Sequence, residues 1–245
     1  MWSYIIFFVV FIVILCVCID NEKIYKENDR KMVEGLNYNY ENIDQILYIN
    51  LKERKDRKIK LLEELTRIEF PDEKITRIDA IKHEKGAIGC AMSHYKALLY
   101  AKTKNYKNVL ILEDDMKFIE SVYKVKKAFK DLQDDFKNDS FNVMFISGRL
   151  DSYEKYKDST RYVRILKMIT ATSYIVDSKY YDTLLQNLKE SSEGMQKYGP
   201  GHGYENDVYW WRLYTKDVWL MLIDKIGFQR PGFSNIIKCF RNIGY

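Results

Sequence analysis

The sequence predicts an α/β fold in which a mixed, mostly parallel sheet is flanked by helices. Short apolar runs without polar alternation are typical of strands buried on both faces, and Val109–Leu112 is one of them. Segments with helical periodicity alternate with these runs, which indicates βαβ units. The acids Glu113, Asp114 and Asp115 directly follow this run, at the place where open α/β sheets bind ligands.

Length, charge and cysteine content narrow the class of protein. The chain has 245 residues, 47% of them hydrophobic, which suits one domain of ordinary size with appendages. Its net charge of +5 comes from 40 basic and 35 acidic residues, a mixed surface compatible with an anionic ligand. We expect no nucleic-acid partner, because no nucleic-acid-binding motif is present. No CxxC pair or zinc spacing occurs, so Cys90 and Cys239 are expected as free thiols, with a disulfide as the alternative.

The first residues predict a membrane anchor. Residues 2–19 are uncharged and almost continuously apolar, and a helix of this length spans about 27 Å, enough to cross a bilayer core. A cleavable signal peptide would need a basic start and a small-residue cleavage site, and the segment has neither. We therefore expect a single-pass transmembrane anchor over 1–19 and a polar stem over 20–42. The flanking charges leave its orientation open, and both a Golgi or endoplasmic reticulum type of anchor and a virus-encoded equivalent fit.

The remaining residues, 43–245, are expected to form one globular domain. Strands are predicted where apolar runs or period-two alternation occur, and helices where apolar residues recur every three to four positions. The expected strands cover 46–49, 74–79, 109–112, 142–148, 162–169, 172–176 and 218–223. The expected helices cover 54–68, 88–99, 122–129, 178–190 and 205–215.

The three consecutive acids are the first candidate site. Glu113, Asp114 and Asp115 repel one another and call for a counter-charge at neutral pH. A hard divalent cation that bridges to a phosphorylated substrate would supply it. The alternative is a strand that ends in a solvated acidic turn.

A second group follows the first predicted strand. Asn50 ends that strand, and Arg54 and Arg57 come shortly after it. If the two strands are neighbours, Asn50 shares one crevice with the acids, and the arginines offer forked donors to phosphates. A solvated first helical turn is the alternative for both arginines.

Two further segments carry polar side chains in suggestive positions. Ser93 and His94 lie in the first turns of a helix that begins with glycines, and helix N-termini bind anions. His94 could contact a substrate hydroxyl, or be a buried histidine satisfied by the backbone. Asp207 follows a glycine-rich loop. It is a candidate general base, and a helix cap is the alternative.

Several stretches together resemble glycosyltransferase family 25, the group of lipooligosaccharide and procollagen galactosyltransferases. They occur in the family's order and cover most of the predicted domain. The matching stretches are Tyr48–Arg57, Gly89–His94 and Leu110–Asp115, with weaker matches at Ala171–Val176 and Gln229–Ile236.

The resemblance implies a GT-A-like, Rossmann-like fold, a UDP-sugar donor that is most often UDP-galactose, and Mn²⁺. The acids look like the family's DxD signature, so Asp115 and Glu113 would hold the metal. Asp207 is similar in position to the family's later carboxylate, the candidate base of an inverting transfer, although Tyr204–Trp210 departs from the family's usual Pro-hydrophobic-Asp form. The side chains expected to contact the donor are Asn50, Arg54, Arg57, Ser93, His94, Glu113 and Asp114.

The resemblance leaves the substrates partly open. UDP-glucose is an alternative donor, and the acceptor hydroxyl could belong to a glycan, a lipid-linked saccharide or a protein. A different class of function is a membrane-anchored sugar-binding or scaffold protein that keeps the fold without catalysis. The presence of Glu113, Asp115 and Asp207 argues against this alternative.

Overall fold

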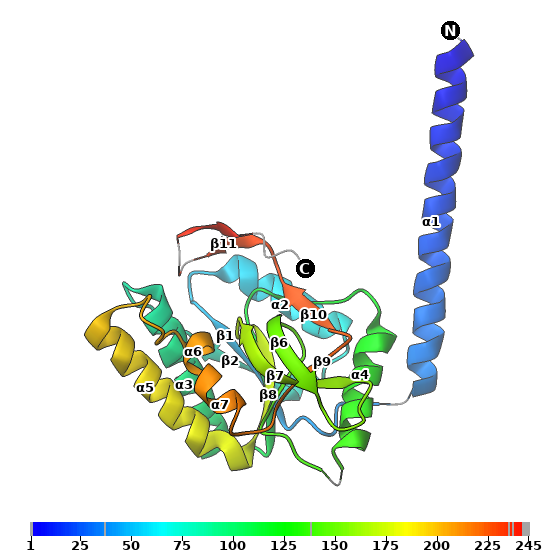
Figure 1. Cartoon of the computed structure of the whole chain (residues 1–245). Helices are drawn as coiled ribbons and strands as arrows, with labels where there is room; N and C mark the ends of the chain where they lie inside the picture. Colours follow the sequence, from blue (N-terminus) through cyan, green and yellow to red (C-terminus); the bar gives the residue numbers. More distant parts are fainter. Residues whose placement is uncertain (1, 37, 138, 235, 237, 242–245) are drawn as a thin grey trace.

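The fold is built around one eight-stranded mixed sheet (Figure 1). The computed structural model describes all residues except 1, 37, 138, 235, 237 and 242–245, and only the backbone of residues 2–6, 9, 13 and 16. The strands follow one another across the sheet in the order β2 (Ile75–Asp79), β1 (Gln45–Asn50), β3 (Asn108–Glu113), β8 (Ser173–Asp177), β5 (Val143–Phe145), β9 (Trp219–Leu222), β7 (Tyr162–Ile169) and β6 (Arg149–Lys155).

The strand directions confirm the predicted mixed, mostly parallel sheet. β1 pairs in parallel with β2 and β3, and β5 pairs in parallel with β9. β8 lies antiparallel between β3 and β5, so β2, β1, β3, β5 and β9 all point the same way. The β6–β7 hairpin closes the edge with antiparallel pairing to β9. The carboxyl ends of β1 and β3 therefore meet at one edge of the sheet.

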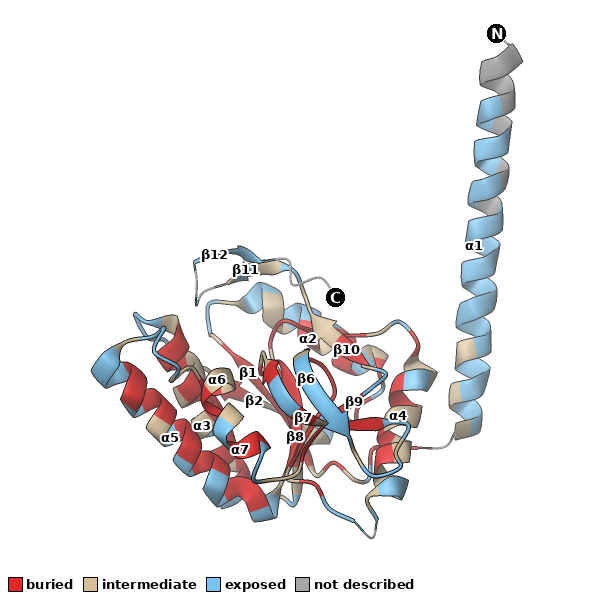
Figure 2. Cartoon of the chain, in the orientation of Figure 1, coloured by how far each residue is buried: buried red, intermediate tan, exposed pale blue. Residues whose placement is uncertain are grey.

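Helices cover both faces of this sheet (Figures 1 and 2). α3 (Gly86–Thr103) and α5 (Tyr181–Tyr198) pack on one face, together with the short helices α6 (Asn206–Tyr209) and α7 (Trp211–Tyr214). α2 (Lys55–Arg67) and α4 (Val122–Asp135) pack on the other. Short 3₁₀ turns, η1 (Asp72–Lys74) and η2 (Ser178–Tyr180), precede β2 and α5.

The central strands are apolar on both faces because each face has its own core. In β1, Leu47 and Ile49 pack toward α3 and α5, whereas Ile46 and Tyr48 pack toward α2 and α4. Successive side chains of a strand point to opposite faces, so a strand covered on both sides needs an unbroken apolar run. The unbroken apolar runs that predicted these strands are therefore explained by the burial of both faces of the sheet.

Several elements differ from the prediction. The segment expected as one helix over 205–215 forms two short helices, α6 and α7. β6 was not predicted, because its side chains are mostly exposed and polar and give no apolar signal. Two small antiparallel pairs were also missed, namely β4 (Met116–Phe118) with β10 (Gly227–Gln229), and β11 (Gly232–Ser234) with β12 (Cys239–Arg241).

The N-terminal residues form one long helix, α1 (Trp2–Leu36), which extends away from the body (Figure 1). It runs without a break across the expected boundary between anchor and stem at residues 19 and 20. Among the residues whose side chains are described, no helix is long and apolar enough to cross a membrane, so the predicted transmembrane anchor is not supported. The described apolar side chains of its first part, such as Phe7 and Phe11, are exposed. From Asp20 onward the helix carries charged residues. The side chains of residues 2–6, 9, 13 and 16 are not among those described.

The base of α1 contacts the body through α4. Asp29 Oδ2 accepts hydrogen bonds from the backbone N–H groups of Val122 (2.9 Å) and Tyr123 (3.3 Å), two of the N-terminal donors that a helix leaves unpaired. The Oγ of Ser121 caps the same turn by accepting from the N–H of Lys124 at 3.1 Å. A side chain of α1 therefore completes the cap of α4.

We predict that Asp29→Ala lowers the free energy of unfolding by about 1 kcal/mol, because it removes the acceptor for two backbone N–H groups. Urea denaturation followed by circular dichroism measures the change. Glu34→Ala is the matched control, since Glu34 pairs with Arg30 on the same helix and an exposed pair of this kind contributes little. Equal losses in the two variants would contradict the capping role.

Candidate active site

A cavity of about 580 Å³ opens at the carboxyl edge of β1 and β3. The ends of these strands are adjacent, since Ile49 pairs with Glu113. The N-terminal turns of α3, the start of α6 and the β11–β12 hairpin form the rest of the wall. The two strand ends predicted to share one crevice therefore do so.

Asp114 joins the two strand ends. Its Oδ2 accepts a hydrogen bond from Asn50 Nδ2 (2.7 Å), and its Oδ1 accepts from Arg57 Nη1 (2.9 Å). Asn50 is held in turn by Arg77, whose Nε donates to Asn50 Oδ1 at 3.1 Å. Burial raises the pKa of Asp114, and Arg57 opposes this rise. Both carboxylate oxygens of Asp114 therefore accept hydrogen bonds from within the protein. The predicted contact of Asp114 with the sugar-nucleotide donor stays a prediction.

Asp115 is buried and only half satisfied. Its Oδ2 accepts from Arg57 Nη1 (2.9 Å) and Gln229 Nε2 (3.0 Å), whereas its Oδ1 has no hydrogen-bond partner among the described residues. Burial and the nearby charge of Glu113 raise the pKa of Asp115 to about 7. A buried carboxylate oxygen without a donor is costly, and a hard divalent cation, which takes oxygen ligands, fits it.

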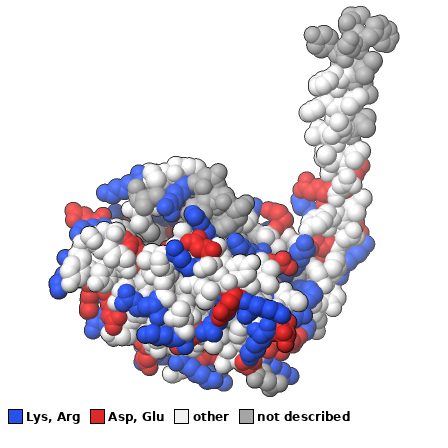
Figure 3. Space-filling model, in the orientation of Figure 1, with Lys and Arg blue, Asp and Glu red and all other residues white. Residues whose placement is uncertain are grey.

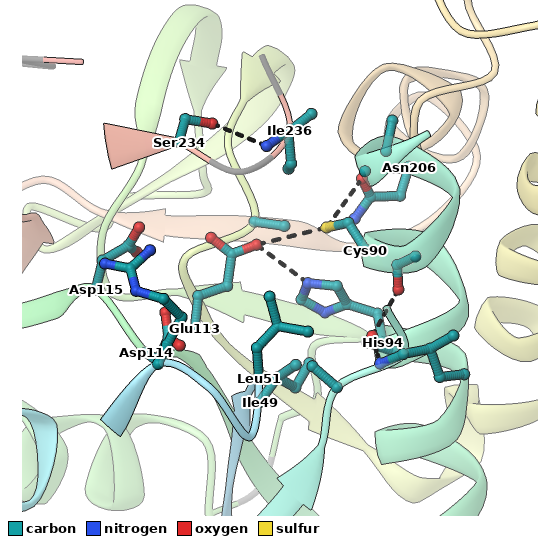
Figure 4. A pocket seen from close by; sticks show the side chains of 18 of the residues that line it. Ile49, Leu51, Cys90, His94, Glu113, Asp114, Asp115, Asn206, Ser234 and Ile236 are labelled. Carbon is teal, nitrogen blue, oxygen red and sulfur yellow. Dashed lines mark hydrogen bonds and ion pairs between the residues drawn. The ribbon is translucent and has the colours of Figure 1, made fainter. Parts of the chain in front are cut away.

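Glu113 stands between Asp115 and a second group of side chains (Figure 4). Its Oε1 lies 3.2 Å from His94 Nε2 and 3.8 Å from Cys90 Sγ. The other ring nitrogen of His94, Nδ1, lies 2.7 Å from the hydroxyl of Tyr174. His94 is thus buried and satisfied by side chains, in contact with an acid of the site rather than only with the backbone.

Ser93 has a local structural contact. Its Oγ donates to the carbonyl of Gly89 (2.5 Å) and accepts from the N–H of Ile81 (2.8 Å). This pairing holds the start of α3 against the loop after β2, where a Cβ on Gly89 would lie 2.4 Å from the carbonyl oxygen of Ile81. Ser93 lines the cavity, and its predicted contact with the donor stays a prediction.

Asp207 also lines the cavity. Its Oδ2 accepts from the N–H of Thr170 (2.9 Å), and its Oδ1 accepts from the N–H of Val208 (3.0 Å). Burial raises its pKa, and these backbone hydrogen bonds oppose the rise. The structure therefore places Asp207 in the same cavity as the three acids, with a raised proton affinity.

Basic side chains face the acids across the cavity. Arg54 pairs with Asp56 and reaches the β11–β12 hairpin through the carbonyl of Phe233 (3.5 Å). Arg230, Lys238 and Arg241 line the same cavity. Over the face shown in Figure 3, basic and acidic side chains are interspersed, as the composition predicted.

Three contributors to the site were missed in the sequence. Gln229 holds Asp115, Tyr174 holds His94, and Cys90 contacts Glu113. The spacing of Cys90 and His94 could have shown that they share one helical face, but only the topology brings Glu113 to them. The cysteines Cys18, Cys90 and Cys239 are free thiols among the described residues, which confirms the expectation for Cys90 and Cys239.

Comparison with known proteins confirms the resemblance that the sequence predicted. Residues 82–198 match the model of glycosyltransferase family 25, described as LPS biosynthesis protein. The match covers somewhat less than half of the chain, and together with the α/β fold it supports a glycosyltransferase. No curated protein matches the sequence.

Several solved structures are similar to the chain at low sequence identity. The chain is similar to a glycosyltransferase involved in the glycosylation of the major capsid of PBCV-1, with 10% identity, a TM-score of 0.48 and coverage of 79% of this chain and 95% of that one. It is also similar to A197 from STIV (13%, TM-score 0.45, coverage 82% and 95%) and to a mannose-1-phosphate geranyltransferase from Thermus thermophilus (10%, TM-score 0.44, coverage 76% and 73%). These similarities are too distant to indicate a substrate.

The raised pKa of Asp115 predicts a pH-dependent stability. Between about pH 4 and 7 the folded protein holds a proton on Asp115 that the unfolded chain releases, so this contribution to stability falls as the pH rises through that window. We therefore predict that Asp115→Asn becomes more stable relative to wild type by about 2 kcal/mol between pH 5 and pH 7.5 in metal-free buffer. Urea unfolding at both pH values measures this, and an unchanged difference would contradict the assignment.

Proposed function

We propose that the protein is a metal-dependent glycosyltransferase that moves a hexose, in the first instance galactose, from a UDP-sugar to an acceptor hydroxyl with inversion. The observation that carries the proposal is the unpaired, buried Oδ1 of Asp115 beside Glu113, in a cavity that also holds Asp207. UDP as the carrier, galactose as the sugar, Mn²⁺ as the metal and inversion as the stereochemistry are carried over from the family.

Asp115 and Glu113 are the residues that would hold the metal. Glu113 ends β3 and Asp115 follows it in the next turn, and burial together with the charge of Glu113 raises the pKa of Asp115. A divalent cation held there would supply positive charge for the departing diphosphate. Arg57 holds Asp115 in place through Oδ2, which leaves Oδ1 without a hydrogen-bond partner among the described residues and able to bind a cation.

The basic side chains of the β11–β12 hairpin would bind the donor's diphosphate. Lys238 and Arg241 line the same cavity as the acids, and Arg57 fixes the hairpin by donating from Nη2 to the carbonyl of Phe233 at 2.9 Å. Phosphate oxygens are preferred partners of such charged donors. The hairpin would therefore exclude water from the donor while it supplies positive charge.

Asp207 would act as the general base. Two backbone N–H groups fix the orientation of its carboxylate, and burial raises its pKa toward neutrality, which favours proton uptake. In the transfer, Asp207 takes the proton from the acceptor hydroxyl, the hydroxyl oxygen bonds to the anomeric carbon, and the bond from that carbon to the diphosphate breaks. The acceptor is a glycan, a lipid-linked saccharide or a protein hydroxyl.

A panel of nucleotide sugars, screened by thermal shift with Mn²⁺ and with EDTA, tests the donor class. We expect UDP-galactose to raise the melting temperature in Mn²⁺ and EDTA to remove the shift, because the metal links the acids to the diphosphate. A larger shift with UDP-glucose would change the sugar but not the reaction. If no nucleotide sugar shifts the melting temperature, and none is hydrolysed or transferred, the protein is a non-catalytic member of the fold and the proposal is wrong.

Two substitutions separate binding from catalysis. We predict that Asp115→Ala abolishes Mn²⁺-dependent UDP binding, whereas Asp207→Ala retains it and lowers transfer by at least about 100-fold, because only Asp115 holds the metal and only Asp207 moves the proton. Calorimetry with UDP and a UDP-release assay give the two readouts. Asp158→Ala, at an exposed position of the chain, is the control that should change neither. Equal loss of UDP affinity in both variants would place Asp207 in the metal site.

A further inference from the structure

We propose that Cys90, His94 and Glu113 form a second metal site, of the kind that binds Zn²⁺, beside the hard-cation pair of Asp115 and Glu113. The three side chains present one sulfur, one nitrogen and one oxygen donor, all within 4.8 Å of one another. The inference does not depend on the proposed transferase reaction, because it concerns only these donors and the ion they select.

The two distances to Glu113 Oε1 are close to those of a tetrahedral zinc site. With Zn–N and Zn–O bonds of about 2.0 to 2.1 Å and a Zn–S bond of about 2.3 Å, tetrahedral geometry separates nitrogen from oxygen by about 3.3 Å and sulfur from oxygen by about 3.6 Å. The structure has 3.2 Å between His94 Nε2 and Glu113 Oε1 and 3.8 Å between Cys90 Sγ and Glu113 Oε1. Two of the three donor pairs therefore already have nearly the spacing that the ion requires, and no donor pair is more than 4.8 Å apart.

Rigid elements hold these donors. Cys90 and His94 are four residues apart on α3, so they project from the same helical face, and Glu113 ends the central strand β3. His94 is buried, with 1% of its surface exposed. Little conformational freedom is lost when an ion binds to such a group.

The outer contacts of His94 suit a metal ligand. Tyr174 occupies Nδ1 at 2.7 Å, which leaves Nε2 directed at Glu113 and Cys90. Metal-binding histidines commonly use their other nitrogen for such a hydrogen bond, because it fixes the orientation of the ring. Asn206 lies beside Cys90, with its Oδ1 4.0 Å from Cys90 Sγ (Figure 4).

The donor set distinguishes this site from that of Asp115. A thiolate and an imidazole favour zinc over Mg²⁺ or Mn²⁺, which prefer carboxylates and water. Zn²⁺ would displace the proton of the Cys90 thiol, which leaves for solvent, and form the Zn–S bond in its place. Because Glu113 belongs to both groups, zinc at this site would withdraw Glu113 from the hard-cation pair.

Cobalt substitution tests the site directly. We use the full chain with Cys16, Cys18 and Cys239 replaced by serine, so that Cys90 is the single thiol. We expect one equivalent of Co²⁺ to give a thiolate charge-transfer band and the intense visible absorption of tetrahedral cobalt, both removed by added Zn²⁺. A weak octahedral spectrum without the thiolate band, or no stoichiometric binding, would overturn the proposal.

Zinc affinity, measured by competition with a chromophoric chelator, assigns the ligands. We expect Cys90→Ser and His94→Gln each to weaken binding at least about tenfold, and Asp115→Ala to leave it unchanged. Circular dichroism and thermal unfolding establish that each variant is folded. Cys90→Ser is a conservative change, because serine differs from cysteine only in having oxygen in place of sulfur. Wild-type zinc affinity in Cys90→Ser would overturn the site. The zinc titration does not involve UDP, so failure of the zinc site would not count against the proposed transferase function.

Discussion

The site depends on one guanidinium group. Arg57 Nη1 contacts both Asp114 Oδ1 and Asp115 Oδ2 at 2.9 Å, and its Nη2 donates to the carbonyl of Phe233. It thereby joins α2, the turn after β3 and the β11–β12 hairpin. Removing one partner of a buried ion pair leaves an uncompensated charge, which is far more costly than the pair is stabilising. The position of the hairpin over the cavity is thus set by the same contact that keeps two acids together.

The guanidinium group of Arg57 contacts both Asp114 and Asp115 but does not satisfy every oxygen of the two carboxylates. Asp114 is fully satisfied by Asn50 and Arg57, whereas Asp115 keeps one unpartnered oxygen among the described residues. Burial and the nearby charge of Glu113 raise the pKa of Asp115 to about 7. The acids therefore differ in their contacts: both oxygens of Asp114 are hydrogen-bonded within the protein, whereas Asp115 keeps one oxygen that a ligand could bind, as we propose.

The sequence allowed the central part of this arrangement to be predicted. Val109–Leu112 is an unbroken apolar run because both faces of β3 are covered, and acids after such a strand lie at the ligand-binding edge. Asn50 lies beside these acids, because its strand pairs in parallel with β3. The hydrogen bond from Asn50 to Asp114, across 64 residues, follows from this pairing. The pattern of strands and helices predicted a mostly parallel sheet but left open whether these two strands are neighbours.

The parts that could not be predicted lack a local signal. β11 and β12 are short and largely exposed, so no periodicity marks them, and their place over the cavity depends on Arg57. Gln229 reaches Asp115 from β10, 114 residues away. The boundary predicted between an anchor and a stem was missed for another reason. The apolar first half and the charged second half of α1 differ in composition, which suggested two segments, although one continuous helix contains both.

Glu113 connects the two halves of the cavity. Asp115, Arg57 and Gln229 form a group of oxygen and cationic partners on one side of it, and Cys90, His94 and Tyr174 form a buried group with sulfur and nitrogen donors on the other. His94 and Cys90 both contact Oε1 of Glu113, so Oε2 is the oxygen that this second group leaves unused. If ions bind on both sides as we propose, the more tightly bound one would set the orientation of Glu113 for the other.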